Sequence, residues 1–279
     1  WSYMPAIDPD TILMLCSLLG AGAVAGITTG LFGVGGGFII VPTLLAILPM
    51  FTGDNDGLVH TAIGTSLASI IVSSFRAVQT HRKNDLVDFS VLKAWAPWLL
   101  IGVAGGVVLA SYMDASALIV VFAVGVLVYS IYFIFPQYFE PKKVPWSLPQ
   151  GVGLAGLASA LGGFSALLGI GGGTPFVVTM VICGRKVHQA VATAAGVGFI
   201  IAIPGAIGFL ILGLTQSAPL PWGSIGYIHV PALLAISFMT VFTSPWGAKI
   251  AQRLNELHLK RAFGIYLIAV AISMLSKLA

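Results

Sequence analysis

Two runs of three glycines stand in apolar sequence, and they are the part of this chain best suited to chemistry. They comprise Gly35, Gly36 and Gly37 in the first half, and Gly171, Gly172 and Gly173 in the second. Glycine is costly inside a helix, so three in succession indicate a break at which the backbone is exposed for use. Each run opens a short apolar segment. The first turn of a helix presents unpaired N–H groups and about half a positive charge, so each run predicts an anion site at a helix N-terminus.

Hydroxyl side chains near both runs can complete such a site. They are Thr28, Thr29, Thr65 and Ser66 in the first half, and Ser165, Thr174 and Thr193 in the second. Thr29 and Ser165 occupy equivalent positions. A small oxyanion fits these donors better than a cation, which would need carboxylates or helix C-termini. Arg76 is a further candidate on the anion pathway, with snorkelling of its side chain to the membrane interface as the alternative.

Other interpretations of the same residues remain open. Glycine in a membrane helix commonly serves close packing, which is the interpretation that fits Gly102, Gly105 and Gly106. Thr65 and Ser66 can instead bond to the preceding turn of their own helix. Neither glycine run is followed by Lys-Ser or Lys-Thr, so a nucleotide-binding loop is only weakly indicated. We expect no metal and no cofactor.

The composition points to a bilayer as the surrounding medium. Of the 279 residues, 58% are hydrophobic and only 8% are charged, whereas soluble domains carry about a quarter charged residues. Long apolar stretches recur along the chain, which predicts an all-α polytopic membrane protein. The net charge of +4 comes from basic residues scattered over short loops, so no nucleic-acid partner is expected. Because the chain opens on Trp1 rather than Met, we expect that an initiator or leader has been removed.

Ten apolar segments are predicted. They run near residues 11–31, 37–50, 59–80, 90–110, 116–135, 148–168, 173–183, 188–212, 226–249 and 261–278. The second and seventh are shorter than the roughly 20 residues of a full helical span, and both begin at a triple glycine. Each is expected to be one arm of a re-entrant hairpin whose glycine turn lies within the bilayer.

Positive charge in the loops predicts the topology. With ten segments and the N-terminus outside, all of the 13 Lys and Arg residues except Lys277 fall at or near the cytoplasmic side. Equivalent loops of the two halves then lie on opposite sides, so the halves are expected to be inverted repeats of five segments each. The predicted organisation is a first transmembrane repeat over residues 1–135, a cytoplasmic linker over 136–149 and a second, inverted repeat over 150–279.

The duplicated motif resembles a known family. The sequences Gly33-Val-Gly-Gly-Gly-Phe, continuing to Val41-Pro42, and Gly169-Ile-Gly-Gly-Gly-Thr-Pro175 are similar to the signature of the TauE/SafE sulfite exporter family, as is the stretch 77–88. The resemblance implies a secondary carrier for sulfite, organosulfonates or related small sulfur or carboxylate anions in a prokaryotic inner membrane. One departure concerns proline: the first copy has Pro42 within its short segment, whereas the second has Val178 there and Pro175 nearer the turn.

The resulting hypothesis is an anion transporter, not an enzyme, that holds its substrate between the two glycine turns and works by alternating access. Export follows from the resemblance alone, and proton coupling is an open possibility. The alternatives are an anion channel with the same turns lining a pore, an intramembrane enzyme such as a protease, and a structural or assembly subunit. The protease would need a deep nucleophile beside a base. The identity of the anion and the oligomeric state are left open.

Overall fold

The computed structural model describes residues 9–32, 36–53, 57–82, 86–138, 147–216, 220–251 and 256–276, and most of these residues are helical. In chain order the helices are α1 (Pro9–Phe32), α2 (Gly37–Thr52), α3 (Leu58–Arg82), α4 (Phe89–Ser111), α5 (Ala115–Ile134), α6 (Gly151–Leu168), α7 (Gly173–Ile182), α8 (Val187–Thr215), α9 (Val230–Ala251) and α10 (Glu256–Leu275). A 3-10 helix, η1 (Pro136–Tyr138), follows α5. A small antiparallel hairpin, β1 (Ser224–Ile225) and β2 (Ile228–His229), precedes α9.

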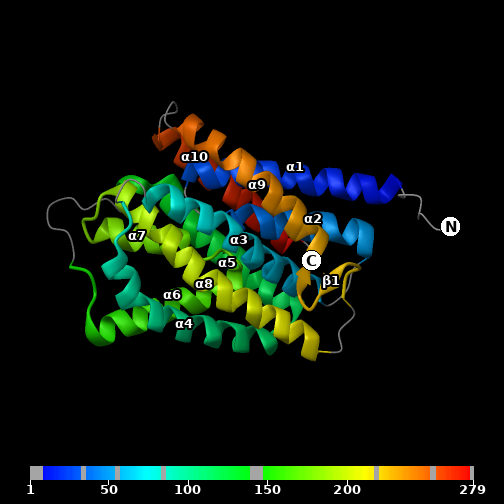
Figure 1. Ribbon diagram of the computed structural model, residues 1–279, viewed down its shortest axis with the longest axis horizontal. Coiled ribbons are helices and arrows are strands. Elements are labelled where there is room, and N and C mark those ends of the chain that lie inside the picture. Colours follow the sequence, from blue (N-terminus) through cyan, green and yellow to red (C-terminus); the bar gives the residue numbers. More distant parts are fainter. Residues whose placement is uncertain are drawn as a thin grey trace.

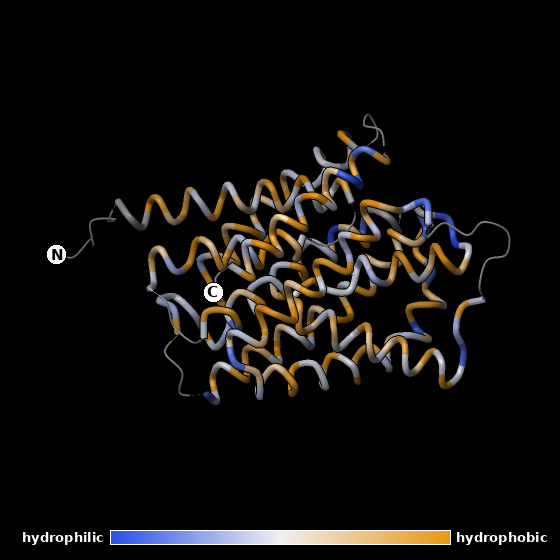
Figure 2. Tube along the Cα trace, turned by 180° about the vertical axis from the view of Figure 1, so that it is seen from behind, coloured by the Kyte–Doolittle hydropathy of each residue, from blue (hydrophilic) through white to orange (hydrophobic). Residues whose placement is uncertain are grey.

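Helix length and apolarity show a polytopic membrane protein. Among the described residues, 8 helices are long and apolar enough to cross a membrane, and α2 and α7 are shorter apolar helices. Hydrophobic colour follows the helices along most of their length, and hydrophilic segments collect at the ends of the bundle (Figure 2). With 16 and 10 residues, α2 and α7 would reach about 24 and 15 Å. Both are therefore too short for the roughly 30 Å hydrocarbon core.

Local sequence signals set several helix ends. The carboxylates of Asp88 and Asp114 accept backbone N–H groups in the first turn of α4 and of α5, as N-cap residues do. The α6 helix ends at Gly169, which has a left-handed φ of 64°. There the N–H groups of Gly169 and Ile170 donate to carbonyls of the last helical turn at 3.2 Å each, in the Schellman arrangement that favours glycine.

The helices pack in pairs around α3. Along the bundle, α1 lies against α9, α4 against α6, α5 against α10, and α3 against α8 (Figure 1). The most buried span is that of α3, with 83% of its apolar window enclosed. The same pairs are obtained when every helix is replaced by its equivalent in the other half, five helices away. The α1–α9 pair, for example, then becomes the α6–α4 pair. The α3 helix is therefore the central element, and it contacts both short-helix regions.

Contacts at the two ends of the bundle fix the relative direction of α3 and α8. At one end, the N–H of Asp88, just before α4, donates to Thr193 near the start of α8. At the other end, His60 near the start of α3 bonds to the carbonyl of Ala110 at 3.1 Å, and Gln216 just after α8 donates to the neighbouring carbonyl of Ser111 at 3.4 Å. The α3 helix thus begins at the end of the bundle where α8 finishes.

The structure corrects some predicted boundaries. The α10 helix begins at Glu256 rather than at 261, because its first turns are polar and carry no apolar signal. Residues 224–229 form the β hairpin, where the start of an apolar helix at 226 was predicted. Within the predicted linker, residues 136–138 form η1, whereas 139–146 lie outside the described residues.

Candidate functional site

The two glycine turns meet inside the bundle. We call residues 36–37 the first tip and residues 169–173 the second tip; Gly35 of the predicted site lies outside the described residues. A Cβ added at Gly37 would lie 2.5 Å from the carbonyl oxygen of Gly169 and 2.6 Å from the Cα of Ile170. Real Cβ atoms do not come so close to backbone, so Gly37 is required for this contact. Close packing, one of the two interpretations of the glycine runs, therefore applies at this position.

Both short helices begin at a glycine in the left-handed conformation. Gly36 precedes α2 with a φ of 76°, and Gly172 precedes α7 with a φ of 72°. A residue with a side chain pays about 1–2 kcal/mol to adopt this conformation. The left-handed glycine lets the chain turn sharply into each helix, so it sets the direction in which the helix starts.

The first turns of α2 and α7 differ in their donors. In α2, the N–H groups of Ile39 and Ile40 both donate to the carbonyl of Gly36 at 3.0 Å. In α7, Phe176 donates to Gly172 at 3.3 Å, and Pro175 has no N–H. The remaining donors of that first turn are the N–H groups of Gly173 and Thr174, at the end of the helix where the dipole is positive.

Hydroxyl groups lie beside both tips, but only one of an equivalent pair is bonded. Thr29 donates to the carbonyl of Ala25 at 2.7 Å. Its counterpart Ser165 lies beside the second tip, with Oγ 3.3 Å from the position of a Cβ at Gly172. Ser165 is fully buried and Thr174 is 2% exposed. Neither hydroxyl has a hydrogen-bond partner in the part of the chain that the structure describes.

The predicted hydroxyls of α3 and α8 each contact another part of the backbone. Ser66 donates to the carbonyl of Gly169 in the second tip at 2.7 Å. Thr65 accepts the N–H of His229 at 2.8 Å, and Thr193 accepts the N–H of Asp88 at 3.0 Å. Ser66 is thereby brought to the tips. Thr65 and Thr193 hold the segments that enter α9 and α4.

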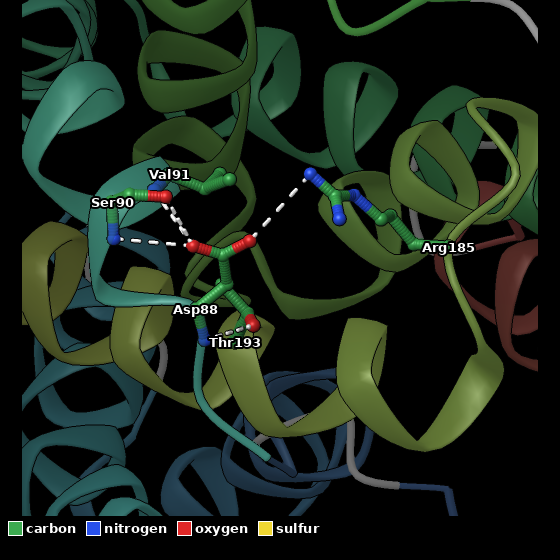
Figure 3. A network of polar contacts seen from close by, with 5 residues as sticks. All are labelled: Asp88, Ser90, Val91, Arg185 and Thr193. Atoms are coloured by element: carbon green, nitrogen blue, oxygen red, sulfur yellow. Dashed lines mark hydrogen bonds and ion pairs between the residues drawn. The ribbon is translucent and has the colours of Figure 1, made fainter. Parts of the chain in front are cut away.

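Asp88 links three segments at one end of the bundle (Figure 3). Its backbone N–H reaches Thr193, its Oδ1 caps α4 through Ser90 and Val91, and its Oδ2 lies 3.7 Å from Nη2 of Arg185 in the turn after α7. Burial alone would raise the pKa of this carboxyl. The hydrogen bonds from Ser90 and Val91 and the charge of Arg185 outweigh burial and hold the pKa below its usual value.

At the opposite end of the bundle, His229 links α3 to the start of α9 in a similar way. It is fully buried, and its Nδ1 accepts the N–H of Ala232 at 3.1 Å in the first turn of α9. Burial lowers the pKa of its imidazole, opposed in part by the backbone of Trp222. No site role was predicted from sequence for Asp88, Arg185 or His229. Asp88 precedes Ser90 and a helical run, which is a recognisable N-cap signal, but nothing adjacent in sequence marks His229.

Arg76 lies on the outer surface of α3. Its side chain is exposed, while Ser73 and Ser74 of the same turn are buried. This position fits the snorkelling alternative, and the atoms closest to the glycines of the tips do not include Arg76. Within the described ranges, no three His, Cys, Asp or Glu side chains gather into a group that could hold a metal ion.

Comparison with known proteins agrees with this architecture. The family model for the sulfite exporter TauE/SafE matches residues 18–274. A probable membrane transporter protein of Haemophilus influenzae is 33% identical over 96% of this chain and 99% of its own length. One from Methanocaldococcus jannaschii is 28% identical over 91% of this chain and 92% of its own length.

A further relative is the probable membrane transporter protein YunE of Bacillus subtilis, which is 26% identical over 69% of this chain and 77% of its own length. No solved structure matches the chain significantly. The match to the family model spans nearly the whole chain, including both glycine runs, and the full-length relatives are named as membrane transporters rather than enzymes. The chain belongs to the TauE/SafE sulfite exporter family of membrane transporters.

Proposed function

We propose that this protein is a secondary transporter that exports a small oxyanion, such as sulfite, an organosulfonate or a related carboxylate, across a prokaryotic inner membrane. The observation that carries the proposal is the contact between the first and second tips, where Gly37 lies against Gly169 and Ile170. The N-termini of α2 and α7, which begin at these two tips, together supply about one positive charge and several N–H donors. They do so without burying a Lys or Arg side chain among lipid-facing helices.

The site and its path are proposed to be built from both halves of the chain. The residues are Gly35, Gly36, Gly37, Thr29, Thr65, Ser66, Arg76, Ser165, Gly171, Gly172, Gly173, Thr174 and Thr193. Thr65 and Thr193 each accept one backbone N–H, which leaves the hydroxyl proton of each available to an anion. Arg76 would act at the mouth of the path, because its side chain is exposed.

The halves are proposed to be inverted repeats, 1–135 and 150–279, joined by a cytoplasmic linker at 136–149, with the N-terminus outside. Two observations support this arrangement: helix pairs recur with a shift of five helices, and α3 begins where α8 finishes. The α2 and α7 helices would then enter from opposite faces as re-entrant arms. Rocking of one half against the other would expose the tips to each side in turn.

Uptake into proteoliposomes tests the function. Sulfite, sulfate, methanesulfonate and acetate are each offered with and without a pH gradient, and counterflow exchange is measured with the best substrate. A transporter gives saturable uptake and counterflow, and a dependence on the pH gradient indicates proton coupling. Large electrical conductance without counterflow would instead identify an anion channel, and no flux of any oxyanion would contradict the proposal.

The tips are tested by Gly36→Val and Gly172→Val, which introduce a side chain at left-handed positions. Both variants are expected to lose uptake. Gel filtration in detergent is the control for folding. Uptake at the wild-type rate by either folded variant would exclude that tip from the transport site.

A further inference from the structure

Two buried hydroxyl groups, those of Ser165 and Thr174, flank the second tip. Ser165 is completely buried and Thr174 is 2% exposed, and neither hydroxyl has a partner among the described residues. A buried polar group left unsatisfied costs about 1–3 kcal/mol. Such groups are uncommon in folded proteins and require an explanation. Two of them at one helix N-terminus indicate a ligand that bonds to both.

Both hydroxyls lie close to the N-terminus of α7. Thr174 is the second residue of α7, and Ser165 lies in the last turn of α6 with Oγ 3.3 Å from a Cβ position at Gly172. Gly172 immediately precedes α7, so Ser165 faces the start of that helix. The N–H groups of Gly173 and Thr174 belong to the first turn of the same helix. Up to four donors therefore lie in or beside the first turn of α7.

The first tip does not offer an equivalent set. Thr29, which corresponds to Ser165, already donates to Ala25 at 2.7 Å. The α2 helix begins Gly37-Phe38, so it has an aromatic ring where α7 has the hydroxyl of Thr174. Gly37 itself is packed against the backbone of the second tip. The first tip can contribute the charge of its helix terminus, but among the residues described around it no buried hydroxyl is left without a partner.

The surroundings of the second tip also limit the charge of the ligand. Apart from Ser165, the side-chain atoms nearest to Cβ positions at Gly171 and Gly172 are those of Ile70, Ile201 and Val197, all apolar. The two helix termini together supply only about one positive charge. The cost of transferring an ion from water rises steeply with its charge, so a dianion would remain undercompensated here.

From these observations we infer that the second tip is the direct binding site, that Ser165 and Thr174 donate hydrogen bonds to the ligand, and that the ligand is an oxyanion with a single negative charge. The inference rests on the proposed transport function and specifies its substrate class. It also assigns the two tips different tasks: the second binds the anion, and the first supports it by packing and by the charge of its helix terminus.

Anion-dependent thermal stabilisation of the purified protein tests this assignment. The probes are methanesulfonate, a permanent monoanion, and sulfate, a dianion at neutral pH, compared at equal ionic strength. Methanesulfonate is expected to raise the Tm of the wild-type protein, and sulfate is not. Equal stabilisation by sulfate would overturn the monoanion assignment.

Ser165→Ala and Thr174→Val test the two hydroxyls. Each is expected to weaken methanesulfonate binding about ten- to a hundredfold, as loss of a hydrogen bond to a charged group does. Each should also leave the Tm without anion unchanged or higher, because an unsatisfied buried group is removed. A merely structural hydroxyl would lower that Tm. The matched controls are Ser130→Ala and Thr179→Val, whose hydroxyls bond within their own helices at 2.6 and 2.9 Å, and both should bind normally.

The outcomes separate this inference from the proposed function. Wild-type binding by both hydroxyl variants, together with oxyanion uptake by the wild-type protein, would overturn the binding site and leave the transporter in place. Absence of both uptake and stabilisation in the wild-type protein would overturn the two together.

Discussion

Asp88 and His229 perform the same structural task with opposite acid–base character. Each donates its backbone N–H to a threonine hydroxyl on a neighbouring helix, Thr193 for Asp88 and Thr65 for His229. Each also caps the helix that follows by accepting the N–H of the residue three positions on. The carboxylate accepts best when charged, whereas the imidazole must stay neutral at Nδ1 to accept at all. Acid is therefore expected to weaken both ends of the bundle.

Replacement of Asp88 separates its cap from its charge. Asp88→Ala should destabilise the protein by about 1 kcal/mol, the usual cost of losing an N-cap, and Asp88→Asn by less, because an amide oxygen still accepts. The pKa of Asp88 is held below 3.8 in the folded protein. The charged carboxylate therefore stabilises the folded protein fully above pH 3.8. This stabilisation is lost as the pH falls through the lowered pKa of the folded protein. Thermal unfolding over an acid titration measures both effects. Equal loss in the two variants would show that the cap is unimportant.

His229 is expected to make the protein sensitive to mild acid. Burial lowers its pKa from 6.5, so the unfolded chain binds a proton at a pH where the folded chain does not. Stability is then complete above pH 6.5 and declines as the pH falls below it. His229→Asn retains a helix-capping side chain without this titration. The variant should lose less stability than the wild-type protein between neutral and mildly acidic pH, and parallel curves would contradict the assignment.

At the scale of elements, the start of α2 packs against the turn between α6 and α7 through backbone rather than side chains. The contact of Gly37 with Gly169 and Ile170 leaves no space for a methyl group. Ser66 of α3 adds a hydrogen bond of 2.7 Å to the carbonyl of Gly169. The start of α2, this turn and the central α3 thus form one unit, whose geometry depends on the absence of a Cβ at Gly37.

Gly37→Ala should disrupt this unit. A Cβ would have to displace backbone, and overpacking of this kind costs about 1–3 kcal/mol or more. The matched control is Gly105→Ala in α4, where nothing lies within 4 Å of the added atom, and there a neutral or slightly favourable change is expected. Thermal unfolding in detergent compares the two. A Gly37→Ala protein as stable as the control would refute the tight contact between the tips.

The sequence predicts the helical elements well where apolar length decides. The long spans, the shortness of α2 and α7 and their start at glycine were all expected, and the structure has them. The polar first turns of α10 gave no apolar signal, and the apolar residues of the β hairpin were assigned to the start of a helix, so both boundaries were missed. The partners of Thr65 and Thr193 lie 164 and 105 positions away. Such bonds depend on how helices pack, which periodicity does not encode.

The unpartnered state of Ser165 shows a second limit of sequence reasoning. Its equivalence to Thr29 was visible in the duplicated sequence, and both were expected to serve the site. Only the packed structure distinguishes them, because the bond from Thr29 to Ala25 and the lack of one at Ser165 depend on side-chain orientation. Residue type therefore identified the candidates, and geometry separated them.

At the scale of the whole molecule, the bundle is a set of helix pairs arranged around α3 and α8. The α1–α9 and α4–α6 pairs flank this centre, and the α5–α10 pair is the remaining part of the bundle (Figure 1). Each of these pairs joins a helix of the first half to one of the second. Relative motion of the halves would therefore slide helices along these contacts rather than separate two independent domains.

The proposed inverted topology is testable by labelling. In a chain without Cys16 and Cys183, single cysteines are placed at Tyr112, just after α4, and at His258, in the polar first turn of α10. These positions lie in equivalent connections of the two halves, between the fourth and fifth helices of each. A membrane-impermeant maleimide added to intact cells should label Tyr112→Cys, whereas His258→Cys should react only after the membrane is permeabilised. Labelling of both positions from the same side would exclude inversion.

The claim that the second tip binds the transported oxyanion is tested most directly by locating a bound oxyanion in the structure. Selenite resembles sulfite and contains an anomalous scatterer, so crystals of the protein grown with selenite can be examined at the selenium edge. The account predicts a selenium peak at the second tip, within hydrogen-bond reach of Ser165, Thr174 and the N–H of Gly173. A peak elsewhere, with the second tip closed over by its own side chains, would contradict it.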